Sequence, residues 1–579
     1  MDRKLLLAMV MIMAVLLLDQ VISPKFYRPK PKPKPVPSQQ QGSAPGQAQA
    51  PATGAGTQGG VQGGAQGGVQ GGVQTGASST AAAPNAGTPV KGQDALSTGA
   101  VLTRPEVPSV PTEIREIRTE HFSASFTSDG GSITHWILSG YRDEVRNQPV
   151  DLVSPGARAY DVIVEAGTRA LDFSQAPFQI TQDDAMGGTL SFEAREASGI
   201  RVTKTYRVGS DRRLLETEVR VSAPPELGAV RYRIGWGSPL PITEPWTKPL
   251  QLQAVALLGT KLEHSAGSKL GPNGERILSG NVRWVANRSK YFIASVIPDS
   301  GTVSEVVFRG AEPGLGTAWL LGTASPGVEV VRHARVYAGP IHYETLASIG
   351  AGLDEVANLG WRWMRGISVL LLKCLNLLHK VIPNYGVAII ILAAATKLLF
   401  YPLTQSSLRS MKVMHHLQPQ IKEMQVKYKN DPMKLNKAMM ALYKENKVNP
   451  MSGCLPMLLQ VPVFIGLYNV LLYSIELRAS GFVGYIRDLS EPDVLMTIGG
   501  LAIHLMPVIM TASTYILQAQ TPVAPAQKGM MYVMPLFMLF FMYSFPSGVI
   551  LYWTVNNLLS ALQQYLVNLA EDRKLAARA

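Results

Sequence analysis

A single lysine, Lys397, lies within an apolar run over residues 385–403. About 20 apolar residues span the hydrocarbon core of a bilayer as a helix. A charge at that depth costs about 2.5–3.5 kcal/mol on insertion scales, so it needs a reason. The chemistry that a lysine offers there is electrostatic, because a cation in a low-dielectric setting attracts acidic groups more strongly than in water. We predict that Lys397 lines a water-filled cavity; snorkelling toward the end of the helix at Tyr401 is the alternative.

Amides and prolines interrupt the other apolar segments. Gln460 lies in the segment 452–475, and Asn556 lies in the segment 549–567. Such groups are typical of helices that face a cavity, because lipid cannot satisfy them. Ordinary helix packing explains any one of these residues. Taken together, Lys397, Gln460 and Asn556 favour a hydrophilic groove.

Other residue types that do chemistry have unsuitable spacing. The histidines before residue 345 are scattered, without a metal-ligand interval, and the two cysteines, Cys374 and Cys454, form neither a disulfide framework nor a CxxC metal pair. Ser547 lies next to a glycine but has no partnered base, and the sequence contains no GxxxxGK[ST] phosphate loop. We therefore expect no enzyme activity, no cofactor and no metal.

Composition indicates a membrane protein with soluble parts. The chain has 579 residues and a net charge of +13, and its mean hydropathy is +0.09 despite a long Gly/Gln/Pro segment. Residues 1–23 are expected to be an uncleaved transmembrane anchor, because a basic start precedes an apolar run and no small-x-small cleavage site follows. A cleaved signal peptide is the alternative. Residues 24–100 are rich in Pro, Gly and Gln and predict a disordered linker.

Residues 101–345 have the period-two pattern of half-buried strands. Phe122, Ala124 and Phe126 alternate with polar residues, and a turn sequence follows at 129–131. Many such strands separated by Gly and Pro turns indicate an antiparallel β sandwich. The pattern leaves open whether this domain binds a carbohydrate or a partner protein.

The next segment, 353–383, contains Trp361, Trp363 and a short apolar run that Lys373 interrupts. The run is too short for a confident membrane span. Tryptophans near one end and basic residues on another face favour an amphipathic helix that lies in the headgroup plane.

A basic helical hairpin is expected at 405–450, with Asp431 as the N-cap and Pro432 as the first residue of its second helix. This segment has nine basic residues and three acids, and short basic loops stay in the cytoplasm. It either docks anionic lipid, ribosome or nascent chain, or only sets topology. Nucleic acid is not expected as the primary ligand, since no RNA-reading motif accompanies the charge. The candidate docking residues are Arg409, Lys412, Lys422, Lys427, Lys434 and Lys437.

Six transmembrane helices satisfy the positive-inside rule, by which short loops rich in Lys and Arg stay in the cytoplasm. The chain crosses outward at 1–23 and returns at 384–404, which places the hairpin and the basic tail, 571–579, in the cytoplasm. The scheme fails if 353–383 also crosses. Four further spans are expected within 451–570, at 452–475, 494–510, 529–545 and 549–567.

Several stretches carry a family resemblance. FYPLTQSSLRSM, MMALYKENKVNPMSGCLPMLLQVPVF, YSIELR and FPSGVILYWTVNNLLSALQQ follow one another within about 385–570, and WVANRSKYFIASVIP occupies 284–298. In these stretches the chain resembles the YidC family of bacterial membrane protein insertases, in the Gram-negative form with a large periplasmic domain. The resemblance implies a membrane α-helical bundle, in which five of the six helices form the insertase core, with a periplasmic all-β supersandwich and a cytoplasmic helical hairpin.

The resemblance also implies roles for particular residues. The groove of the family is hydrophilic and open to the cytoplasm, and its positive residue, usually Arg, is here Lys397. Tyr552 and Trp553 match the substrate-contacting aromatic pair. The implied activity is insertion and folding of nascent membrane proteins at the inner membrane, with ribosome, Sec translocon and anionic lipids as candidate partners. A small-solute transporter or channel subunit is the alternative, and it predicts inverted repeats, which we do not see among the spans.

Overall fold

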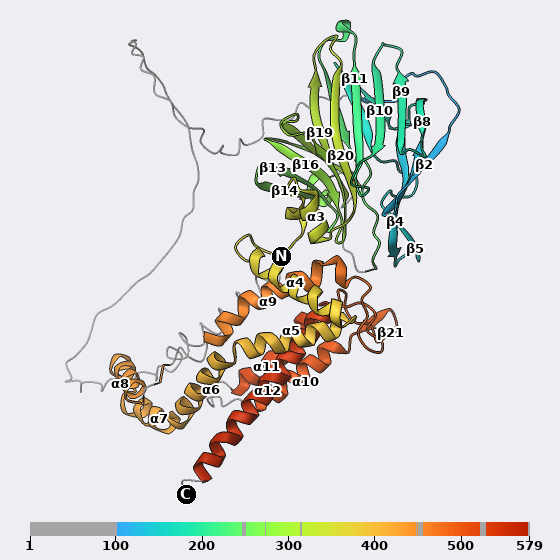
Figure 1. The fold of residues 1–579 in the computed structure, drawn as a ribbon. Helices are drawn as coiled ribbons and strands as arrows, with labels where there is room; N and C mark the ends of the chain where they lie inside the picture. Colours follow the sequence, from blue (N-terminus) through green and yellow to red (C-terminus); the bar gives the residue numbers. More distant parts are fainter. Residues whose placement is uncertain are drawn as a thin grey trace, which may run out of the picture. The chain divides into compact units, whose positions relative to one another are not determined.

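The computed structural model describes residues 101–245, 251–271, 274–312, 315–446, 448–449, 455–520 and 528–576, all of which belong to one compact unit. The expected anchor at 1–23 and the linker at 24–100 lie outside these residues, as does Cys454. Figure 1 shows that the described chain consists of a β domain followed by a group of helices.

The largest sheet of the β domain is antiparallel throughout, in the order β14-β13-β16-β17-β20-β11-β10-β9-β8. Its nine strands are β8 (Gln179–Asp184), β9 (Thr189–Arg195), β10 (Arg201–Val208), β11 (Leu215–Ser222), β13 (Gln253–Leu258), β14 (Lys261–Ala266), β16 (Val282–Arg288), β17 (Phe292–Pro298) and β20 (Val330–Pro340).

A seven-stranded sheet has the order β1-β7-β6-β12-β19-β18-β15, and only its β1–β7 pair is parallel. Its strands are β1 (Val101–Thr103), β6 (Asp161–Ala166), β7 (Arg169–Asp172), β12 (Val230–Gly235), β15 (Glu275–Ser279), β18 (Glu305–Glu312) and β19 (Leu315–Ala324). A smaller sheet contains β2 (Ile114–Arg118), β3 (Phe122–Thr127), β4 (Ser132–Asp143) and β5 (Gln148–Asp151).

The main core gathers the inward faces of all three sheets into one buried cluster, which includes Trp136, Tyr206, Val219, Tyr232 and Leu320. The alternation expected from the sequence is confirmed, because Phe122, Ala124 and Phe126 of β3 and every second residue of β11 are buried. On the other face of the largest sheet, α3 (Tyr343–Ile349) and the 3-10 turn η4 (Leu353–Val356) pack on a second apolar cluster. Further short turns are η1 (Phe173–Gln175), η2 (Pro225–Leu227) and α2 (Gly267–Leu270).

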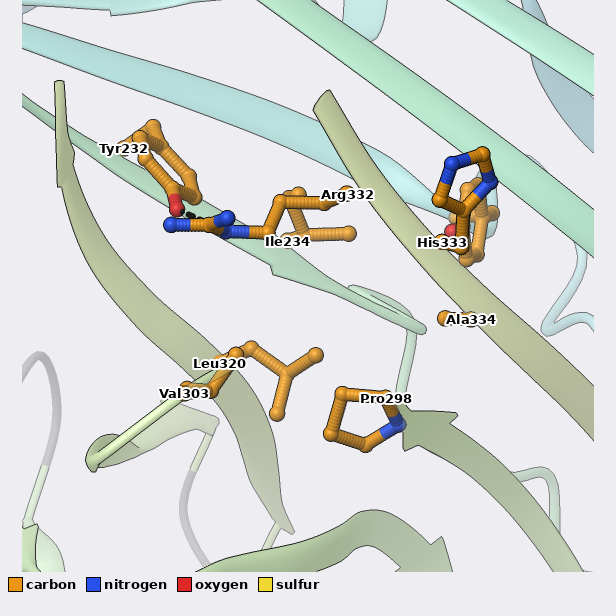
Figure 2. Close-up of a pocket in the computed structure, with 9 residues that line it drawn as sticks. Tyr232, Ile234, Pro298, Val303, Leu320, Arg332, His333 and Ala334 are labelled. Atoms are coloured by element: carbon orange, nitrogen blue, oxygen red, sulfur yellow. Dashed lines mark hydrogen bonds between the residues drawn. The ribbon is translucent and has the colours of Figure 1, made fainter. Parts of the chain in front are cut away.

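One narrow cavity lies inside the β domain beside Tyr232 and Arg332, whose guanidinium donates to the tyrosine hydroxyl at 2.5 Å (Figure 2). Its volume is about 10 Å³, which is about the space of one water molecule. The cavity is therefore a small packing gap, and it is too small to hold a ligand.

The turn after β3 is held by a fully buried lysine. The Lys204 amine donates to the carbonyls of Gly130 and Tyr160, both at 2.9 Å, and to the Ser132 hydroxyl at 3.3 Å. Gly130 has a φ of 91°, and a Cβ there would meet the Ser174 carbonyl, so the turn requires glycine. Burial lowers the pKa of Lys204 to about 8 and raises the pKa of its neighbour Asp161 to about 6. At pH 7 the amine therefore remains protonated and fully hydrogen-bonded.

We expect Lys204→Met to destabilise the β domain by about 3–5 kcal/mol, because it leaves two buried carbonyls and Asp161 without their cation. The melting temperature of the purified full-length protein should fall by roughly 10 °C. Lys261→Met is the matched control, since the Lys261 side chain is 74% exposed. Equal melting temperatures for the two variants would contradict the role given to Lys204.

The helical part begins with α4 (Arg365–Val381), which packs on α9 (Leu455–Tyr473). Next come α5 (Tyr385–Leu399), α6 (Tyr401–His416), α7 (Gln418–Lys427) and α8 (Pro432–Glu445). After α9, the chain forms η6 (Ile475–Leu477), α10 (Met506–Gln520), α11 (Lys528–Met542) and α12 (Ser547–Ala576), and α12 packs on α5 and α10. The first residues of the expected tail at 571–579 continue α12.

The expected helix over 384–404 is shorter than predicted. It ends at Leu399, and Tyr401–Met414 leaves at an angle of 63°. Pro402 lies in the first turn of α6, where it has no N–H to continue the ladder of α5. Within the described ranges no single helix is both long and apolar enough to span a membrane, although this bent pair is, by length and composition.

The helix expected at 494–510 is wrong over residues 494–505. Strands β21 (Met496–Ile498) and β22 (Leu501–Ile503) form a hairpin there, and α10 starts only at Met506. Gly499 and Gly500 both have positive φ, 57° and 83°, as a tight hairpin turn requires. The Asp493 carboxylate then accepts from the backbone N–H of Leu505 and Met506, at 2.8 and 2.9 Å, at the start of α10.

The basic hairpin has three helices where two were expected. Its first helix breaks at Leu417, because Pro419, in the first turn of α7, has no N–H to continue the ladder of α6. The predicted start of α8 is confirmed: the Asp431 side chain accepts from the Lys434 N–H, and Pro432 opens the helix. Leu417 and Leu442 pack together with Met424 in a small apolar cluster between these helices.

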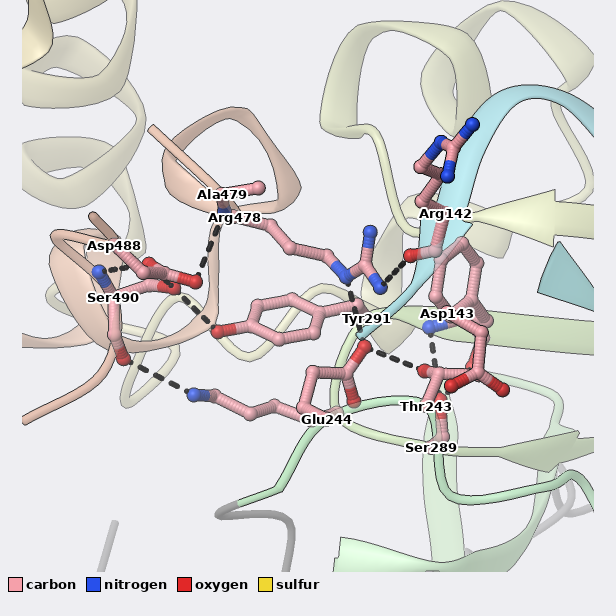
Figure 3. Close-up of polar contacts among 12 residues, drawn as sticks. Arg142, Asp143, Thr243, Glu244, Ser289, Tyr291, Arg478, Ala479, Asp488 and Ser490 are labelled. Atoms are coloured by element: carbon pink, nitrogen blue, oxygen red, sulfur yellow. Dashed lines mark hydrogen bonds and ion pairs between the residues drawn. The ribbon is translucent and has the colours of Figure 1, made fainter. Parts of the chain in front are cut away.

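Buried ion pairs join the β domain to the loop that follows α9, and Figure 3 shows the pair of Arg478 with Glu244. Arg478 donates to Glu244 at 2.8 Å and to the carbonyl of Arg142 at 2.5 Å, and Lys290 donates to Glu491 at 2.5 Å. The side chains of Arg478 and Glu244 are 4% and 0% exposed. Removing either partner would strand the other charge in a buried site, so the pairs hold this loop in one arrangement.

An acid beside these pairs should make the folded unit sensitive to pH. Partial desolvation of its carboxyl group, and then the Asp488 carboxylate, raise the pKa of Glu144 to about 7; Glu244 and Glu491 add to the rise, and Arg478 opposes it. The folded protein therefore binds this proton more tightly than the unfolded chain does. The resulting stabilisation is complete below the ordinary value of 4.5 and is lost as the pH rises through 7.

We expect Glu144→Gln to raise the melting temperature at pH 8 and to leave it unchanged at pH 4. Because the Glu144 side chain is exposed, solvent screens the effect to about 0.5 kcal/mol, or roughly 1–2 °C. Thermal unfolding of the full-length protein at several pH values measures this difference. A variant whose pH profile runs parallel to that of the parent would refute the assignment.

Candidate functional site

The candidate site is built where α5, α9 and α12 meet. Lys397 lies in the last turn of α5, where a cation interacts favourably with the helix dipole. Its amine is part-buried and donates to the Ser560 hydroxyl of α12 at 2.6 Å. Ser560 in turn donates to the Asn556 carbonyl one helical turn earlier, at 2.7 Å. The lysine is thus held by a neutral oxygen that is itself fixed by the helix.

No carboxylate of the described chain lies within ion-pair distance of the Lys397 amine, which is part-buried. A buried or half-buried cation is normally paired. Here the positive charge is desolvated in part but remains uncompensated. This combination is suited to attracting an acidic group from another molecule.

Next to this lysine, Gln460 of α9 donates to the Tyr552 hydroxyl of α12 at 2.7 Å. The same hydroxyl faces the side chains of Asn556 and of Thr396, which precedes Lys397 on α5. The structure therefore brings together all three groove residues expected from the sequence, with Tyr552 at the centre of the polar cluster.

The two aromatic residues of α12 differ in access. Tyr552 is only 2% exposed, because its ring is buried behind the hydrogen bond to Gln460. Trp553 is half-buried and packs edge-on against Phe464 of α9, with ring centroids 4.8 Å apart. Of the pair, Trp553 is the residue more able to touch a chain that passes along these helices.

Ser560 was missed in the sequence, although helical spacing could have found it. Residues 552, 556 and 560 recur every four positions and so share one face of a helix. Two further contacts fix α12 beside its neighbours: Gln563 donates to Thr404 of α6 at 2.9 Å, and Asn557 donates to Thr514 of α10 at 2.8 Å.

The six candidate docking residues lie on α6, α7 and α8, on different helices from the polar cluster. All are exposed except Lys412, which is half-buried. Lys427 lies over the Tyr428 ring at 5.6 Å, and Lys434 pairs with Asp431 at 3.2 Å. The hairpin therefore presents mostly solvated positive charge.

A polar cleft of about 460 Å³ on the β domain is lined by His135, Arg146 and Asp151, among others. These groups are already paired: His135 with Asp151 at 2.7 Å, and Arg146 with Asp143 at 2.8 Å. The carbohydrate-binding alternative thus has a cleft but no unpaired charge among these groups to select a ligand.

Comparisons with known proteins agree with the two-part architecture. The family described as 60Kd inner membrane protein matches residues 377–574, and the YidC periplasmic domain matches residues 115–371. The membrane protein insertase YidC of Syntrophus aciditrophicus is 32% identical over 515 residues, which cover 85% of this chain and 93% of the relative. The chain belongs to the YidC family of membrane protein insertases. The insertase YidC of Pelobacter propionicus is similarly 32% identical, over 85% of this chain and 92% of its own.

The β domain is accordingly the periplasmic domain of an inner membrane insertase, and the family is not one of enzymes. A solved structure of an active YidC insertase, with the first transmembrane domain resolved, covers 80% of this chain and 95% of its own. Its identity is 18% and its TM-score is 0.34, a likeness too low to carry an argument.

We expect a photo-crosslinker at Trp553 to capture a stalled nascent membrane protein several times more efficiently than one at Tyr552. The reason is access, because Tyr552 is buried and Trp553 is not. Val549, which is 1% exposed on the same helix, is the matched negative position. Equal capture at 549 and 553 would show that Trp553 does not face the substrate.

Proposed function

We propose that this insertase receives the hydrophilic part of a nascent membrane protein in a groove lined by Lys397, Gln460 and Asn556. The observation that carries the proposal is the uncompensated amine of Lys397, which is bound to the neutral Ser560 hydroxyl. An acidic side chain or chain end that enters can replace this hydroxyl and gain a charge-assisted hydrogen bond, which is stronger than a neutral one.

The apolar part of the substrate would move along the outer faces of the helices into lipid. Exposed apolar side chains on α9 and α11, such as Leu458, Val533 and Phe540, line this route. Transfer of apolar surface contributes about 25 cal/mol per Å², and the membrane potential acts on acidic residues that cross. The step therefore needs no nucleotide, metal or other cofactor.

The proposal includes the six-span topology, with the hairpin and the C-terminus in the cytoplasm. Exposed Arg409, Lys422, Lys427, Lys434 and Lys437, with half-buried Lys412, would then form a docking surface for the ribosome, the nascent chain or anionic lipid. The Sec translocon is a further candidate partner. Trp361 and Trp363, stacked and exposed before α4, suit a helix at the headgroup level.

The rival function, a small-solute transporter or channel subunit, is distinguished by conductance. A transporter or channel reading requires a path that opens to both sides of the membrane. Purified protein in planar bilayers should give no solute-dependent current if the groove accepts polypeptide only.

We expect Lys397→Ala to slow insertion of substrates with acidic exported tails by about tenfold, which matches the loss of one charged hydrogen bond. Lys397→Arg should retain insertion, because it keeps the charge. Lys380→Ala, at an exposed lysine on α4, is the control. The insertion rate of each variant is measured in vesicles by protease protection of the substrate tail. A parental rate for Lys397→Ala would exclude the electrostatic role.

A further inference from the structure

One short stretch of the loop after α9 touches both the β domain and the start of α12. We call this stretch, residues 488–491, the bridging segment. On the β-domain side, the Tyr291 hydroxyl donates to the Ser490 hydroxyl at 2.7 Å (Figure 3). Lys290 donates to the Ser490 carbonyl at 3.1 Å and to Glu491 at 2.5 Å. Tyr291 and Lys290 are almost completely buried, at 0% and 4% exposure.

The other side of the bridging segment accepts from the first turn of α12. The Ser547 N–H donates to the Glu491 carbonyl and the Gly548 N–H to the Leu489 carbonyl, both at 2.8 Å. The Ser547 hydroxyl donates to the Asp488 carbonyl at 2.8 Å. The first N–H groups of a helix have no partner within it, so these carbonyls satisfy the orphan donors of α12.

The contact with α12 is close as well as polar. A Cβ at Gly548 would meet the Leu489 carbonyl at 2.8 Å, so the backbone of the helix lies directly against the bridging segment. The segment is also fixed internally, because Asp488 accepts from the Ser490 N–H at 2.7 Å and from the Ala479 N–H at 2.9 Å. A displacement of the bridging segment would therefore also displace Ser547 and Gly548.

Tyr552 and Trp553 lie five and six residues after the start of α12, which is about 8–9 Å along the axis. We propose that Lys290 and Tyr291 are positioning residues, through which the β domain sets where the substrate-facing part of α12 lies. The substrate-facing role of α12 rests on the proposed function. The mechanical link from Tyr291 to Gly548 does not depend on it.

The test is hydrogen–deuterium exchange on the full-length protein in lipid nanodiscs, with the amides of Ser547 and Gly548 as reporters. We expect Tyr291→Phe, which removes only the hydroxyl, to speed their exchange by about threefold to tenfold, as the loss of one hydrogen bond predicts. Tyr337→Phe is the matched control, because that buried hydroxyl donates to Pro340 within the β domain at 2.8 Å. Faster exchange in the bridging segment alone, with 547 and 548 unchanged, would overturn the proposal.

Lys290→Met supplies a second variant, and a charge swap, Lys290→Glu combined with Glu491→Lys, tests whether the ion pair can be restored in the reverse orientation. The double variant should recover at least half of the protection that either single charge change removes. A double variant as unprotected as the singles, together with an unaffected Tyr291→Phe, would show that these residues position nothing.

Crosslinking separates this inference from the proposed function. If the link and the groove both exist, Tyr291→Phe lowers capture of a stalled chain from Trp553, whereas Tyr337→Phe does not. If Lys397→Ala inserts normally but exchange at 547–548 responds to Tyr291→Phe, the groove proposal fails and the link stands. If Lys397→Ala is impaired and exchange does not respond, the link fails and the groove stands.

Discussion

The hydrogen bond between the amine of Lys397 and the neutral hydroxyl of Ser560 is the interaction on which the site in the helical part of this protein depends. A cation that is taken out of water retains strong attraction for any acid that reaches it, because the surrounding dielectric constant is low. A fixed carboxylate beside it would cancel that attraction. The hydroxyl of Ser560, anchored on the carbonyl of Asn556, satisfies one donor of the amine without neutralising its charge. Among the described residues no carboxylate pairs with this amine, which is what the proposed binding of an acidic substrate group requires.

Three buried cations in the β domain and its neighbouring loop are treated in the opposite way. Lys290 is paired with Glu491, and Arg478 is paired with Glu244. Lys204 bonds three oxygens and lies near Asp161. Paired charges of this kind add geometric definition more than stability, since desolvation offsets much of their attraction. They are used where the β domain and its neighbouring loop must keep one arrangement.

How far the sequence predicted the fold depended on whether a local pattern was decisive. The alternation in β3 and β11 identified half-buried strands, because side chains of a strand point to opposite faces. The helix cap at Asp431 was also predicted correctly, because a capping hydrogen bond joins residues only three positions apart. Hydropathy alone failed at 494–510, where the turn at Gly499-Gly500 makes a hairpin out of apolar residues that would otherwise suit a helix. The Gly499-Gly500 dipeptide was a signal for a hairpin turn, but the apolar composition of the segment led to the prediction of a helix.

The residues by themselves determined which groups could do electrostatic work: a lysine within an apolar run, and amides in the segments that follow. Their composition also set the division into an exported β domain and apolar helices, because burial patterns have the period of the element that carries them. Only the tertiary structure decided that Ser560 holds Lys397, that Tyr552 is buried while Trp553 is accessible, and that residues 488–491 join the β domain to α12. These contacts link positions up to 201 residues apart, and no local pattern in the sequence predicts which distant side chain will accept or donate a given hydrogen bond.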